Sequence, residues 1–298
     1  MRISVIIPHL NQPAGLERCL RFLTEGSRQP DEVIVVDNGS DVWPEMVCAA
    51  VPGIRLLYEA EPGPGLARNT GIAAATGDIL AFIDSDCIPG AGWLATIARE
   101  MADPAAEILG GDVRIALADP PAMTALEAYE TIYAYRMDRY IAREGFTGTG
   151  NLAVRRAVMN AVGPFRGLAV AEDRDWGQRA TEAGHRLRYV PDMQVYHPAR
   201  ESFDEIFRKW DRQTAHDYVR ARDSRGGRLW FWAKIFAMPL SPLAELPRII
   251  GSDRLRGAAN RGRAFTALVR VRLHRAQRMV WLATGGDPDR LSSVWNRS

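Results

Sequence analysis

The chain has 298 residues and a mass of 33.1 kDa, of which 47% are hydrophobic and 25% charged, which is typical of a folded protein and excludes a disordered or fibrous one. Its net charge of +2 divides into −7 over residues 1–200 (19 Lys and Arg, 26 Asp and Glu) and +9 over 201–298 (19 against 10). The three cysteines, Cys19, Cys48 and Cys87, are odd in number and far apart, which argues against a disulfide framework or a zinc-binding cysteine motif.

The expected location follows from three further features. The cysteine usage indicates a reducing compartment, and the first residues lack the long apolar core and cleavage site of a signal peptide. The most apolar late segment, 229–250, is interrupted by charged residues and three prolines, so it is a poor match to a membrane span. We expect a cytoplasmic protein that can lie peripherally at the inner face of the plasma membrane.

The first 90 residues alternate short, apolar, β-branched runs with segments of helical periodicity. Strands are expected at 2–8, 32–40, 54–59 and 78–86, and helices at 13–26 and 66–77. Strands that are apolar throughout are typical of a sheet covered on both faces. This pattern predicts an α/β fold with a Rossmann-like, doubly wound mixed sheet.

The later elements are less regular. Helices are expected at 93–102, 123–144 and 172–184, a strand at 107–115, a glycine-rich turn followed by a strand and a helix at 148–163, and a pair of short strands at 187–198. From residue 201 the pattern is helical and rich in arginine. We predict an α/β domain over 1–200 and a helical, basic C-terminal region over 201–298.

Acidic residues stand where two of the predicted strands end. Ligands of open α/β sheets bind outside the carboxyl ends of the strands, so Asp37 and the pair Asp84 and Asp86 should converge on one crevice. Two carboxylates flanking Ser85 can face a hard divalent cation, although plain turn chemistry also accounts for them. A dinucleotide fingerprint is excluded nearby, because Arg68 stands where its third glycine is required.

Six motifs in order resemble the inverting nucleotide-sugar transferases of glycosyltransferase family 2, which have the GT-A fold. The motifs are SVIIPHLN at 4–11, VIVVDNGS at 33–40, GLARNTGIAAATGDILAFIDSD at 65–86, GTGNLAVRR at 148–156, EDRDWGQRATEAGHRLRYVP at 172–191 and VYHP at 195–198. The resemblance covers roughly residues 1–210. It implies a transferase that moves a sugar from a nucleoside-diphosphate sugar to an acceptor.

The resemblance also implies roles for the residues at the strand ends. Asp86 and His197 would ligate Mn or Mg, and an imidazole suits Mn better than Mg; the alternative for His197 is a structural histidine. Asp84, with Ser85, would contact the donor's ribose or the water shell of the metal. The nucleobase would be held by three residues, namely Pro8, Asp37 and Arg68. Arg68 has the alternative of a surface ion pair.

The catalytic base is implied at the start of the predicted helix 172–184. By resemblance, Asp173 would take the proton of the acceptor hydroxyl, with Glu172 in support. The structural alternative is that acidic residues in a first turn simply stabilise the helix dipole. Four residues are placed on the acceptor side, namely Gly150, Asn151, Trp176 and Arg179, although Trp176 and Arg179 fit equally well as packing residues.

Partners and rival functions complete the expectations. UDP is favoured as the nucleotide, with GDP or dTDP open, and the acceptor would be a glycan, a lipid-linked molecule or a protein. The basic C-terminal region would lie on a membrane surface, or form a helical bundle against the catalytic domain or a second subunit in a homodimer; a nucleic-acid partner is not expected. The rivals are a sugar nucleotidyltransferase, whose Gly-rich loop the sequence lacks, and an inactive scaffold of the same fold.

Overall fold

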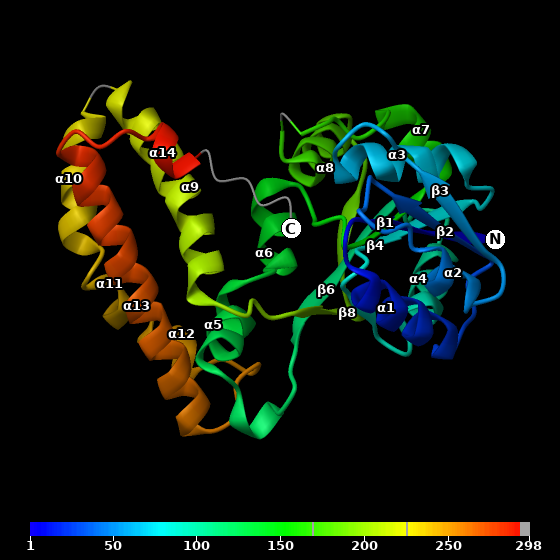
Figure 1. Cartoon of the computed structure of the whole chain (residues 1–298), viewed down its shortest axis with the longest axis horizontal. Helices are drawn as coiled ribbons and strands as arrows, with labels where there is room; N and C mark the ends of the chain where they lie inside the picture. The colour runs from blue at the N-terminus through cyan, green and yellow to red at the C-terminus, as the bar shows by residue number, and fades with distance from the viewer. Residues whose placement is uncertain (169, 225, 293–298) are drawn as a thin grey trace. The chain divides into compact units, whose positions relative to one another are not determined.

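The computed structural model describes residues 1–168, 170–224 and 226–292 and divides into two compact units (Figure 1). The first unit contains residues 1–116 and 135–198, and the second contains 117–134 and the residues from 199 onward. The predicted division at residue 200 places segment 117–134 in the first domain, whereas in the structure this segment belongs to the second unit. The reason is that its helix α5 (Ala125–Tyr133) shares an apolar core with α13 (Ala258–Ala283) of the second unit.

The first unit is built on one mixed sheet. Among the described residues, its strands lie in the order β3-β2-β1-β4-β7-β6-β8-β5. Their bounds are β1 Ile3–His9, β2 Glu32–Asp37, β3 Ile54–Tyr58, β4 Ile79–Ile83, β5 Ile88–Pro89, β6 Ile108–Ala116, β7 Asn151–Arg155 and β8 Leu187–Pro198. Strands β1 to β4 run parallel, and β7 is antiparallel to both β4 and β6. The predicted α/β class with a mixed sheet is confirmed.

Helices cover both faces of this sheet (Figure 1). Their bounds are α1 Pro13–Glu25, α2 Glu45–Ala49, α3 Pro64–Ala74, α4 Trp93–Met101, α6 Met137–Glu144, α7 Arg156–Val162 and α8 Glu172–Glu182. Side chains alternate along the strands, so Val5 and Ile7 join the core with α1, α2 and α4, while Ile6 joins the core with α3, α7 and α8. Burial on both faces explains why these strands read as continuous apolar runs.

Several elements differ from the sequence prediction. The helix expected over 123–144 is two helices, α5 and α6, because Tyr135 has a φ of 48°, in the left-handed region that a helix cannot continue through. The segment 187–198 is one strand, β8, where a pair was expected. The short elements α2 and β5 were not predicted, since neither is long enough to show a periodicity.

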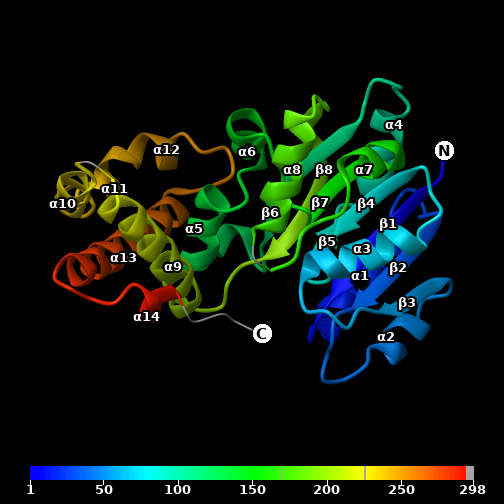
Figure 2. The same ribbon diagram turned by 90° about the horizontal axis from the view of Figure 1, so that it is seen from above.

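The second unit is helical. Besides α5 it contains α9 Phe203–Arg222, α10 Gly227–Ala237, α11 Ser241–Ala244, α12 Leu246–Ile250, α13 and α14 Asp289–Ser292. Figure 2 shows α9, α10 and α13 gathered together, and they contact one another. Arg275 of α13 lies buried with its guanidinium 3.9 Å from the ring centre of Trp210 on α9. Within the described ranges, none of the helices is both long and apolar enough to cross a membrane.

Candidate functional site

The first two strands end side by side at a buried histidine–aspartate pair. His9 of β1 lies opposite Asp37 of β2 in the parallel register, directly after Pro8, which is buried. The Nδ1 of His9 is 2.8 Å from a carboxylate oxygen of Asp37, and its Nε2 accepts a hydrogen bond from the backbone N–H of Gln12 at 3.3 Å. An acceptor nitrogen at Nε2 leaves the proton on Nδ1, so a neutral His9 donates to Asp37.

Asp37 is occupied by the chain itself. One carboxylate oxygen accepts from His9 and from the Ser40 hydroxyl at 2.5 Å, and the other accepts from the backbone N–H groups of Gly39 and Ser40 at 3.2 and 3.0 Å. Burial alone would raise the pKa of Asp37, but the hydrogen bonds from Ser40 and His9 outweigh it and hold the pKa below its usual value. Asp37 therefore shapes the 37–40 turn, and its contact with the nucleobase stays a prediction.

The fourth strand ends in the turn that carries Asp84, Ser85 and Asp86. Helix α1 packs so closely on this turn that a Cβ at Gly15 would lie 3.1 Å from the Cα of Asp86. The residue at position 15 must therefore be small, which fixes the helix start against the turn. Both aspartates are only partly exposed at the end of the sheet.

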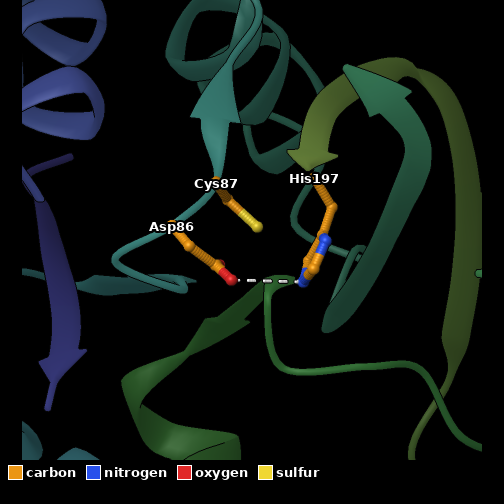
Figure 3. Close-up of side chains that lie close together, drawn as sticks. All are labelled: Asp86, Cys87 and His197. Carbon is orange, nitrogen blue, oxygen red and sulfur yellow. Dashed lines mark ion pairs between the residues drawn. The ribbon is translucent and has the colours of Figure 1, made fainter. Parts of the chain in front are cut away.

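Asp86 faces His197, which ends β8 (Figure 3). The Oδ2 of Asp86 is 3.4 Å from the Nε2 of His197, and the sulfur of Cys87 completes a group whose ligand atoms all lie within 4.8 Å of one another. Burial raises the pKa of Asp86 above its usual value, His197 opposes the rise and Asp84 adds to it. The structure thus brings together the two residues predicted to hold a metal, although they are far apart in sequence.

The hydrogen bonding of His197 favours a cation ligand at Nε2. Its Nδ1 lies 2.7 Å from the carbonyl oxygen of Pro198, which can only accept, so Nδ1 carries a proton. In the neutral ring the lone pair of Nε2 then faces the carboxylate of Asp86, an arrangement that a cation between them would satisfy. The ring of Tyr135 packs against His197, with centroids 4.6 Å apart and the ring planes tilted by 33°.

Cys87 is a member of this group that the sequence analysis missed. Its thiol is buried, and burial raises its pKa well above the usual value, with Asp84 and Asp86 adding to the rise. Its position directly after Asp86 was the available signal. A thiol beside a carboxylate and an imidazole adds a soft donor to the group.

Arg68 bridges Asp84, in the turn after β4, and Glu172, the first residue of α8. Its guanidinium donates to Asp84 at 2.6 Å and to Glu172 at 3.0 Å, and its side chain is buried. This excludes the surface ion pair considered for Arg68, because its side chain is buried. Arg68 fixes the carboxylate of Asp84 relative to the start of α8, and its contact with the nucleobase stays a prediction.

The glycine-rich turn before β7 packs against the carboxylate of Asp84. A Cβ at Gly150 would lie 2.6 Å from the Oδ2 of Asp84, and a Cβ at Gly148 would lie 4.0 Å from the Oδ2 of Asp173. Gly150 therefore allows the backbone to approach the carboxylate of Asp84, whereas at Gly148 the atom that a Cβ would crowd is the Cε of Met137, at 2.9 Å. Of the four predicted acceptor-side residues, Gly150 is the one that lies among the acidic groups.

The first turn of α8 carries three acidic residues with different partners. Glu172 pairs with Arg68, and Asp175 pairs with Arg166 and Arg179. Within the part of the chain that the structure describes, Asp173 has no ion-pair partner, and one of its oxygens accepts from the N–H of Arg174. Burial, and then the neighbouring Glu172, raise the pKa of Asp173 above its usual value. Helix stabilisation alone does not require a half-buried carboxylate whose pKa is raised.

The other three predicted acceptor-side residues make hydrogen bonds within the fold, and their contact with an acceptor stays a prediction. The Asn151 amide donates to the carbonyls of Asp112 and Met193 and accepts from Trp93. Trp176 is buried and donates to the carbonyl of Gly163. The guanidinium of Arg179 is likewise committed to neighbouring groups, namely the Asp175 carboxylate and the carbonyls of Val162 and Pro164.

Sequence comparisons agree with this geometry. The family model described as "Glycosyl transferase family 2" matches residues 4–163, more than half of the chain. Glycosyltransferase AglE of Haloferax volcanii is 35% identical over 215 residues, 70% of each chain. Pre-mycofactocin glycosyltransferase of Mycobacterium tuberculosis is 32% identical over 225 residues, which are 70% of this chain but 45% of that protein.

Solved structures show the same fold. A mannosyltransferase from Pyrobaculum calidifontis, in complex with GDP-Man and Mn2+, has a TM-score of 0.59 at 20% identity, covering 94% of this chain and 87% of its own. S. aureus TarS 1-349, in complex with UDP-GlcNAc, has a TM-score of 0.54 at 19% identity, covering 96% and 93%. Taken with the family match and the relatives, these findings show that the chain belongs to glycosyltransferase family 2, as a glycosyltransferase of the GT-A fold.

Proposed function

We propose that the protein is an inverting, cation-dependent transferase that adds a single sugar from a nucleoside-diphosphate sugar to a glycan, lipid-linked or protein acceptor in glycoconjugate or cell-surface polysaccharide synthesis. One observation supports this most strongly: the Asp86–His197 pair and the carboxylate of Asp173, which has no ion-pair partner among the described residues, both lie in the unit whose strand ends carry the family's motifs. UDP is favoured, and GDP is the alternative suggested by the mannosyltransferase neighbour.

The residues present fit a divalent cation. Asp86 offers a carboxylate oxygen and His197 a nitrogen lone pair, and Mn2+ accepts both donor types. When bound, the cation would neutralise negative charge on the departing diphosphate. Two related structures contain GDP-Man with Mn2+, and UDP with Mg2+, respectively, which supports the same assignment.

The proton transfer would be carried out by Asp173. As the acceptor oxygen attacks the anomeric carbon, the bond from that carbon to the diphosphate oxygen breaks, and the hydroxyl proton passes to the Asp173 carboxylate. Attack from the face opposite the leaving group inverts the anomeric configuration. A base with a raised pKa holds that proton better than an ordinary aspartate.

Addition of a single sugar is supported by the sequence after the sheet. Processive relatives carry a Gln-x-x-Arg-Trp motif together with membrane spans, whereas this chain has Phe207-Arg208-Lys209-Trp210 without the glutamine. We therefore propose that each acceptor receives one sugar and is then released.

The proposal is tested by incubating the protein with UDP-, GDP- and dTDP-sugars and measuring release of the nucleoside diphosphate with Mn2+, with Mg2+ and with chelator. We expect one nucleotide to give slow hydrolysis that Mn2+ supports and the chelator abolishes. Absence of a cation-dependent response to all three nucleotides, in hydrolysis and in thermal stability, would contradict it.

A further inference from the structure

Helix α10 of the second unit is apolar on its exposed side as well as its buried one. Phe231, Ile235 and Met238 are buried in a core shared with α13. The opposite side and the turns after it expose a row that we call the outer stripe, made of Leu229, Trp232, Phe236, Leu240 and Leu243.

The outer stripe has the spacing of one helix face. Leu229, Trp232 and Phe236 stand at positions i, i+3 and i+7 of α10, and the row continues into α11. Leu229, Phe236 and Leu240 are 77%, 73% and 67% exposed. A helix on the surface of a soluble protein normally presents polar residues here, so a contiguous row of large apolar side chains indicates an interaction surface.

The charged residues beside the outer stripe indicate what kind of partner it binds. Arg228, which precedes Leu229, is exposed on one edge. On the other edge, the ammonium of Lys234 lies 4.6 Å from the ring centre of the exposed Trp230 and also pairs with Asp217. The region 201–298 as a whole carries a charge of +9. Apolar side chains flanked by tryptophan and by cations match the boundary between lipid tails and anionic headgroups.

We propose that the outer stripe docks on the surface of an anionic lipid bilayer. With 11 residues, α10 is about 16 Å long, roughly half of the apolar thickness of a bilayer, so it would lie along the surface rather than cross it. A second copy of the chain is a poorer partner, because a twofold contact through the stripe would bring the arginines of both copies to one interface. Docking requires neither a bound cation nor an active Asp173, so it stands or fails separately from the transfer reaction.

The test is sedimentation of the full chain with vesicles of phosphatidylcholine, alone or mixed with phosphatidylglycerol. We expect binding to the mixed vesicles that weakens in high salt, and much weaker binding to phosphatidylcholine alone. The variant Leu229→Ser/Phe236→Ser should bind about tenfold or more weakly, because two large apolar side chains are lost from the contact. The control Val42→Ser/Met46→Ser removes two exposed apolar residues of the first unit and should bind like the wild type.

Three further measurements complete the test. The Leu229→Ser/Phe236→Ser variant should keep the wild-type circular dichroism and melting temperature, because both side chains are exposed. If this double variant is unstable, the single variant Phe236→Ser is used in its place for the binding measurement. Tryptophan fluorescence should be quenched by bromine-labelled lipid in the wild type. Equal binding to both vesicle types, no loss on Leu229→Ser/Phe236→Ser, or a dimer that this variant dissociates without any vesicle binding would overturn the proposal.

Discussion

One hydrogen bond orients the ring of His197, which we propose as a cation ligand. The carbonyl of Pro198 fixes the proton on Nδ1 and thereby turns the Nε2 lone pair toward Asp86. The tilted ring of Tyr135 packs against the imidazole and limits its movement. A ligand held in this way loses little rotational freedom when a cation binds, which favours affinity.

Replacing His197 by alanine should weaken Mn2+-supported UDP binding by about one to two orders of magnitude, because a ligand is removed from the cation. Isothermal titration calorimetry of UDP with and without Mn2+ measures this. The matched control is His185→Ala, whose ring pairs with Glu107 at 3.0 Å and should not affect binding. If both variants lost UDP affinity equally, the loss would reflect a disturbed fold and not a missing cation ligand.

Replacing Asp173 by asparagine should leave Mn2+-dependent UDP binding intact and slow sugar transfer by about 10²–10⁴-fold, since the proton acceptor is lost. Separate measurement of binding and turnover distinguishes the two effects. A loss of UDP binding in Asp173→Asn, with normal folding, would contradict the assignment of Asp173 as base.

The raised pKa of Asp173 also predicts an effect on stability. A carboxyl whose folded-state pKa is raised favours folding only while it is protonated, and this contribution is lost as the pH rises through that pKa. Asp173→Asn should therefore raise the melting temperature relative to wild type more at pH 8 than at pH 4. The control Asp175→Asn should lower it at pH 8, because it breaks the ion pairs with Arg166 and Arg179.

At the scale of the elements, the turn before β7 controls the geometry of Asp84. The substitution Gly150→Ala would place a methyl group 2.6 Å from the Oδ2 of Asp84, so the turn or the carboxylate must move. We expect a loss of about 1–3 kcal/mol in the free energy of unfolding, together with weaker donor binding. Urea denaturation and UDP titration measure both. Gly92→Ala, at a position with open space and a φ of −96°, is the control and should change neither.

The elements that could be predicted from sequence are those whose pattern is local. The strands of the first unit show apolar runs because they are buried on both faces, and α1 shows its leucines at helical spacing. The break between α5 and α6 could not be predicted, because nothing in the residues around Tyr135 forbids a helix. The left-handed backbone at that position coincides with the packing of the Tyr135 ring against His197, a contact between distant parts of the sequence.

At the scale of the whole molecule, sequence motifs located the site but not its internal contacts. The sequence predicts that Asp84, Asp86 and His197 lie close together, and in the structure they do. The pairing of Arg68 with Asp84 and Glu172 depends on how α3 and α8 pack on the sheet, which no local pattern encodes. The hydrogen bonds that occupy the Asp37 carboxylate depend in the same way on His9, the residue that the neighbouring strand places opposite it.

The proposed cation would join Asp86, in the turn after β4, to His197, near the end of β8. Pulsed electron paramagnetic resonance of Mn2+ bound with UDP tests this directly, because a coordinated imidazole nitrogen couples to the manganese electron spin. We predict nitrogen coupling in the wild type, its loss in His197→Ala and its retention in His185→Ala. Bound Mn2+ without nitrogen coupling in the wild type, or with coupling that persists in His197→Ala, would contradict the account.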